Sequence, residues 1–191
     1  MFELILGLAL FFSAHALSIV RPAWRVQAID RAGEVPFKVG YSLVSILGLW
    51  LVVVGYGAAR VHEPVLLYQS PVWMRHVTLL LMLPVFPLVL AAYLPGRIQR
   101  TLKHPMLIGV LLWAVAHLLA NGTLADLLLF GSFLVWAVAD LVSLARRQEP
   151  PVPGAPPGKW NDLIAIVAGL VLYVAFIAFV HRWLFGVAPI G

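Results

Sequence analysis

The stretch HPMLIGVLLWAVAHLLAN, residues 104–121, decides the fold. Pro105 stands where a helix tolerates a missing N–H, at its first turn, and the residues after it are almost all apolar. At 1.5 Å per residue, about 17 helical residues span ~26 Å, just enough for a hydrocarbon core of ~30 Å. A membrane helix is therefore predicted to start near His104. It is predicted to end at Asn121-Gly122, where Gly122 would supply a left-handed residue.

The composition extends this interpretation to the whole chain of 191 residues. The chain is 62% hydrophobic and 11% charged, whereas soluble domains carry roughly 25% charged residues. The mean hydropathy is +0.97. The sequence therefore predicts an all-α, polytopic membrane protein of one domain, with no separate soluble catalytic domain. The chain has no cysteine, which excludes disulfides, thiolate catalysis, zinc bound by cysteine and iron–sulfur clusters.

Apolar runs bounded by charge, proline or glycine predict a single bundle of six transmembrane helices across residues 1–191. They lie at 2–20, 39–59, 76–95, 105–121, 123–144 and 162–184. Pro84 and Pro87 predict a bend or an unwound turn within the third helix. Residues 148–160 contain five prolines and predict an extended, mobile cytoplasmic linker.

The basic residues predict the orientation in the membrane. Ten of the thirteen lie in alternate loops, and by the positive-inside rule that side is cytoplasmic. Both termini are then expected in the periplasm, with the protein in a bacterial inner membrane. The net charge of +5 is thus interpreted as a topology signal, and no nucleic-acid partner is expected. The ten residues are Arg21, Arg25, Arg31, Lys38, Arg97, Arg100, Lys103, Arg146, Arg147 and Lys159.

Histidine is the remaining source of chemistry, because no catalytic triad order, P-loop, dinucleotide motif or HExxH is present. Of six histidines, only His15 and His117 fall at hydrocarbon depth, where ionisable residues are functional candidates. Two neutral imidazoles from separate helices are a common way to hold haem iron in a bundle. Trp113 precedes His117 by one turn among small residues, which leaves room for a flat ligand. The alternative is ordinary packing, with each imidazole bonded to a backbone carbonyl.

The other four histidines lie at predicted interfaces: His62, His76, His104 and His181. The two histidines are predicted at different depths in the membrane: His15 lies ~20 Å from the outer end of its helix and His117 only ~6 Å. This difference opposes binding of both to one iron. A common ligand requires the short helix 105–121 to sit low in the bundle.

Several motifs resemble those of the NnrU family of bacterial membrane proteins. They are the run from His104 to Gly109, continued by Trp113, His117, Asn121-Gly122 and the segment 128–133, together with Tyr41-Ser42-Leu43-Val44-Ser45, Ala92-Tyr93-Leu94-Pro95-Gly96 and Asn161-Asp162-Leu163-Ile164. The resemblance covers most of the chain and implies a role in nitrite and nitric oxide reduction in denitrifying bacteria. That role would be in redox, sensing or assembly, with a redox partner.

The NnrU family is similar to the zeta-carotene isomerase, a membrane enzyme that uses haem b. This likeness implies that His15 and His117 are the iron ligands. It also implies an alternative activity, cis–trans isomerisation of a polyene such as zeta-carotene. Ala114 stands where the isomerase has a cysteine, which weakens that alternative. A third alternative is a membrane assembly or interaction protein without a cofactor.

A weaker likeness connects the chain with membrane isoprenylcysteine methyltransferases, whose Arg-His-Pro segment helps to bind the methyl donor. Here the segment is Lys103-His104-Pro105, with lysine for arginine. His104 is therefore a candidate cofactor-binding residue, and the alternative is a residue at a helix start.

Overall fold

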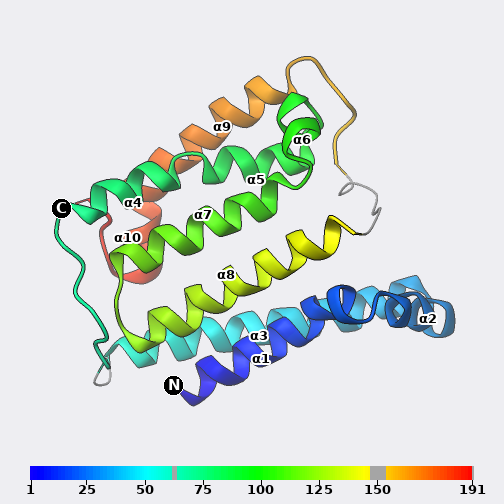
Figure 1. The fold of residues 1–191 in the computed structure, drawn as a ribbon, viewed down its shortest axis with the longest axis horizontal. Coiled ribbons are helices and arrows are strands. Elements are labelled where there is room, and N and C mark those ends of the chain that lie inside the picture. The colour runs from blue at the N-terminus through cyan, green and yellow to red at the C-terminus, as the bar shows by residue number, and fades with distance from the viewer. Residues whose placement is uncertain (62–63, 147–153, 191) are drawn as a thin grey trace. The chain divides into compact units, whose positions relative to one another are not determined.

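The computed structural model describes residues 1–61, 64–146 and 154–190 and is drawn in Figure 1. All regular structure in these ranges is helical, and an isolated bridge joins Leu66 to Thr123. The predicted all-α class is confirmed. His62 and residues 147–153, where part of the predicted linker falls, lie outside the described ranges.

Within the described residues, five helices are long and apolar enough to cross a membrane, against the six that were predicted. The remaining predicted helix, 105–121, is shorter than the other five. It forms α7, Pro105–Ala120, and has 16 residues. Its 16 residues rise ~24 Å, less than the ~30 Å of a typical hydrocarbon core, so a sixth span is not confirmed.

The chain divides into two compact units. The first comprises Met1–Leu67 and Thr123–Ser143, and the second Tyr68–Gly122 and Leu144–Gly191. The helices of the first unit are α1 (Phe2–Val20), α2 (Pro22–Ala32), α3 (Glu34–Val61) and α8 (Leu124–Leu144). Those of the second are α4 (Met74–Met82), α5 (Val85–Tyr93), α6 (Arg97–Leu102), α7, α9 (Asn161–Ala175), a π-helical turn (Phe176–Val180) and α10 (His181–Phe185).

In the first unit α1 and α3 lie side by side (Figure 1). Glycines allow the approach: a Cβ on Gly7 would lie 2.6 Å from the backbone nitrogen of Val52. A Cβ on Gly48 would lie 2.7 Å from the backbone nitrogen of Phe11. Such contacts are too close for a real Cβ, so this interface depends on bare backbone, as membrane helices often do. α3 starts at Glu34, before the predicted residue 39, and Glu34 pairs with Lys38 at 2.6 Å.

α8 joins this unit through aromatic side chains spaced three residues apart. Phe130 contacts the ring of Tyr56, with centroids 6.1 Å apart. Phe133 lies 5.0 Å from the ring of Phe12. Trp136 lies 6.0 Å from the same ring. Residues at i and i+3 share one face of a helix, so the three rings form a continuous contact surface.

In the second unit, the predicted span 76–95 breaks into α4 and α5 at Leu83-Pro84. Proline has no N–H, so the carbonyl of Leu80 receives the N–H of Leu83 instead, at 3.3 Å. The carbonyl of Leu79 thereby loses its helical partner. The hydroxyl of Tyr173 on α9 donates to it at 2.8 Å, which restores the lost bond.

A second connection joins the start of α9 to the segment before α6. The carboxylate of Asp162 accepts the backbone N–H groups of Arg97 at 2.7 Å and of Ile98 at 3.0 Å. The side-chain amide of Asn161 donates to the carbonyl of Pro95 at 2.9 Å. Two motifs quoted for the family resemblance therefore meet in space, and together they hold the first turn of α6.

One local expectation is corrected. Gly122 is not among the residues with positive φ, and α7 ends instead at Asn121 in extended conformation. A glycine is required at 122 for another reason, because a Cβ there would clash with the carbonyl oxygen of Tyr68. In the described part of the proline-rich segment, Ala155 donates its N–H to the carbonyl of Tyr93 at 2.9 Å, and the mobility of the linker stays a prediction.

Candidate functional site

His15 is half-buried on α1, and its Nδ1 lies 2.8 Å from the carbonyl oxygen of Phe11, one turn earlier. A carbonyl can only accept, so Nδ1 carries the hydrogen in this bond. In the neutral imidazole the lone pair is then on Nε2. Among the described residues no group donates to Nε2. The backbone therefore fixes both the tautomer and the direction of the ring.

Aromatic rings surround His15. The ring of Phe11 stacks on it, with centroids 4.0 Å apart and planes at 18°. Tyr41 on α3 lies at 5.3 Å and Trp136 on α8 at 5.8 Å, the latter edge-on. The indole Nε1 of Trp136 is buried and has no hydrogen-bond partner in the part of the chain that the structure describes. The rings of His15 and Trp136 are therefore in contact, but the indole N–H of Trp136 does not donate to the imidazole.

His117 repeats this local geometry in the second unit. Its Nδ1 lies 2.8 Å from the carbonyl of Trp113, again four residues earlier, which puts the lone pair on Nε2. The ring of Trp113 lies 5.2 Å from the imidazole, tilted by 49°. The side chain of Asn121 donates to the His117 carbonyl at 2.9 Å and completes the last turn of α7. Both candidate ligands are therefore held by an aromatic residue four positions earlier.

The two histidines belong to different units, His15 to the first and His117 to the second. Their convergence on one iron stays a prediction. Among the described residues no group of three or more His, Asp or Glu side chains could hold a metal ion. That finding argues against a site built from carboxylates and imidazoles. It does not bear on haem, which needs only one or two axial side chains.

His104 precedes α7 as its N-terminal cap residue, and Pro105 behind it is fully buried. His104 lies 13 residues before His117, or ~20 Å along the helix. Lys103 has φ 61°, the only positive φ of a non-glycine residue in the described ranges. The N–H of His104 bonds the carbonyl of Leu102 at 2.7 Å, which makes a strained three-residue turn. A role of His104 in binding a methyl donor stays a prediction.

One polar group was missed by the sequence analysis. Asp126 is only 3% exposed, and its carboxylate accepts the hydroxyl of Tyr56 at 2.6 Å. It also accepts the N–H of Thr123 at 2.8 Å and the Thr123 hydroxyl at 2.6 Å. The contact with Thr123 is local and has the three-residue spacing of a helix cap. Tyr56 is 70 residues from Asp126 in the sequence, so no local sequence pattern could predict this hydrogen bond.

Comparison with known proteins identifies a family. The family described as NnrU protein matches residues 3–189, nearly the whole chain. No curated protein matches the chain, and no solved structure does.

Proposed function

We propose, from the premise that this chain belongs to the NnrU family, that it is an integral membrane protein that binds haem b through His15 and His117. We further propose that it serves nitrite and nitric oxide reduction in a redox, sensing or assembly role. Family membership supports the membrane location, and the geometry of the two histidines supports haem binding.

The observation that carries the proposal is the identical anchoring of the two imidazoles. Each Nδ1 donates at 2.8 Å to the carbonyl four residues earlier, so each Nε2 is the basic nitrogen. A histidine that binds a metal almost always donates its other ring N–H to a carbonyl, carboxylate or water, which fixes the tautomer and strengthens the ligand. The aromatic rings beside both imidazoles supply the apolar walls that a macrocycle requires.

Haem b would supply one-electron exchange at the iron. The chain's own residues bind and orient: the two carbonyls hold the imidazole rings, and the apolar helices exclude water. With both His15 and His117 bound to it, the group would supply electron transfer or ligand exchange rather than oxygen activation.

The test is an absorption spectrum of the detergent-solubilised protein, oxidised and reduced, after expression with added haem precursor. We expect a Soret band with sharp reduced α and β bands. His15→Ala and His117→Ala should each lose the six-coordinate spectrum. His181→Ala is the matched control, because its Nδ1 also bonds a carbonyl, that of Val187 at 2.7 Å, but it was predicted at an interface.

Haem content per protein separates a shared iron from separate sites. One haem per chain, made high-spin by either substitution, supports a shared iron. Two haems per chain, halved by either substitution, would replace it by two sites. A protein without a Soret band, with both variants unchanged in spectrum and in anaerobic growth on nitrite, would refute haem binding and leave a cofactor-free membrane protein.

The isomerase alternative has no specific support in the geometry. Ala114 stands at the position of the isomerase cysteine and is fully buried. Conversion of a cis-configured zeta-carotene by the reduced protein would nevertheless establish it.

A further inference from the structure

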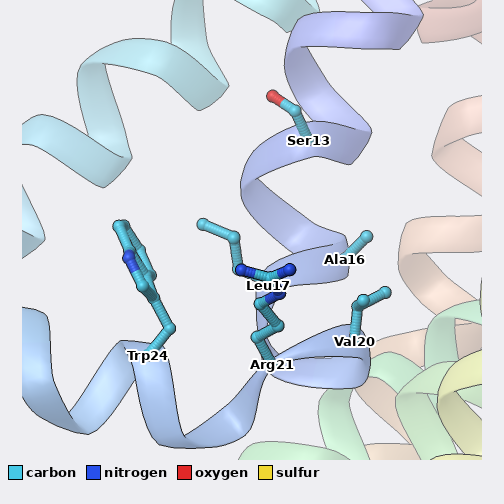
Figure 2. A pocket seen from close by; sticks show the side chains of 6 residues that line it. All are labelled: Ser13, Ala16, Leu17, Val20, Arg21 and Trp24. Atoms are coloured by element: carbon cyan, nitrogen blue, oxygen red, sulfur yellow. The ribbon is translucent and has the colours of Figure 1, made fainter.

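A cavity of about 360 Å³, largely open to its surroundings, lies where α1 ends and α2 begins. Figure 2 shows the six side chains that line it, with Ser13 at one end and Arg21 and Trp24 at the other. All come from α1, α2 and the Arg21 junction. The remaining members, Ala16, Leu17 and Val20, are apolar. The volume is at the lower end of the range for small-molecule sites.

The wall of the cavity is almost entirely apolar, and a cationic residue stands at one end of it. Ser13 and Val20 are seven residues apart on α1, so the wall extends ~10 Å along the helix. The hydroxyl proton of Ser13 is already donated to the carbonyl of Leu10, at 2.8 Å, and so offers no hydrogen to a ligand. The cationic group is at the far end, where Arg21 follows the last residue of a helix long enough to span a membrane.

The charge at that end is not neutralised by the part of the chain that the structure describes. Among the described residues no carboxylate forms an ion pair with Arg21, whereas Lys38 nearby in sequence is paired with Glu34. Arg25 lies one turn further along α2, and no residue of α2 is buried. Trp24 is 45% exposed, as expected of an aromatic residue at the level of the lipid headgroups.

We propose that this cavity binds an anionic phospholipid, with an acyl chain along Ala16, Leu17 and Val20 and the phosphate at Arg21. The matching features are the ~10 Å apolar wall, the single cation where it ends, and the position of that cation at the end of a membrane-spanning helix. A free phosphate ion would use only the arginine and leave the apolar wall unfilled. A basic residue near the membrane surface attracts anionic lipid over zwitterionic lipid, typically about fivefold for one side chain.

The test uses the full chain in detergent, titrated with phosphatidylglycerol whose acyl chains carry bromine. Bromine quenches nearby tryptophan, and the signal of Trp24 is isolated as the difference between the wild type and Trp24→Phe. Equally brominated phosphatidylcholine is the comparison lipid. We expect half-quenching of Trp24 at about fivefold less phosphatidylglycerol than phosphatidylcholine.

Arg21→Gln should remove the difference between the two lipids. Arg31→Gln is the matched control, because it removes the same charge from α2 outside the cavity, and it should keep the difference. Ala16→Phe fills the cavity and leaves Arg21 in place, so both lipids should quench less. Equal quenching by the two lipids in the wild type, or an equal effect of the two arginine substitutions, would overturn the proposal. Should Arg21→Gln fail to fold, undiminished quenching in Ala16→Phe would overturn it by itself.

Discussion

Gly55 and Gly57 lie two residues apart on α3, and we expect substitution by alanine to change stability differently at the two positions. A Cβ on Gly55 would lie 2.7 Å from the carbonyl carbon of Glu3 and 2.8 Å from the Cα of Leu4 on α1. A Cβ on Gly57 would meet nothing within 4 Å. Both positions are helical, so alanine should bring the same gain of about 1 kcal/mol in helix propensity. Only Gly55→Ala must also push two helix backbones apart.

The magnitude follows from the difference between the two variants, in which the propensity gain cancels. Overpacking a close interface costs about 1–3 kcal/mol, and the contacts at Gly55 are with backbone, which cannot change rotamer. We expect Gly57→Ala to stabilise the protein and Gly55→Ala to be less stable than Gly57→Ala by about 2 kcal/mol. For a chain of this size that corresponds to a difference in Tm of roughly 4–8 °C.

The assay is thermal unfolding in one detergent, followed by far-ultraviolet circular dichroism, with all three proteins at the same detergent and protein concentration. Equal shifts in the two variants would refute the reasoning, because they would mean that α1 does not approach α3 at Gly55. A gain in stability for Gly55→Ala would refute it too.

Three further substitutions test single contacts by the same unfolding assay or by hydrogen exchange. Tyr56→Phe removes one donor from the buried carboxylate of Asp126 and should destabilise the protein by about 1–3 kcal/mol. Tyr173→Phe removes a bond to an uncharged carbonyl and should cost less, about 0.5–1.5 kcal/mol; the reverse order would contradict the reasoning. Asp162→Ala deprives two N–H groups at the start of α6 of their acceptor, so those amides should exchange faster while those of α8 stay unchanged.

Hydropathy and proline position predicted the helical class, five of the six proposed spans and the break at Pro84, because each depends on residues close together in sequence. The sixth proposed span, at α7, is not confirmed, because composition alone does not distinguish a short apolar helix from a span. The glycines show what a sequence pattern cannot supply. Gly55 and Gly57 have the same local setting, yet one touches α1 and the other touches nothing, and only the packing partner distinguishes them.

The candidate site was predicted in part for the same reason. His15 and His117 could be selected by depth, and the carbonyl four residues earlier follows from helix geometry. The rings of Tyr41 and Trp136 could not be foreseen, because they reach His15 from α3 and α8. Long-range packing between helices decides which aromatic residue lies beside an imidazole.

The indole of Trp136 gives the strongest reason to prefer a ligand at His15 over plain packing. A buried N–H without an acceptor costs about 1–3 kcal/mol, and Trp136 Nε1 is such a group within the described residues. Its ring lies 5.8 Å from that of His15, edge-on, so the unpaired donor lies beside the candidate ligand. Under the proposed function, a haem at His15 would offer its carboxylates as acceptors for this N–H. The unpaired indole is therefore a cost that packing alone leaves in place and that the proposed ligand would remove.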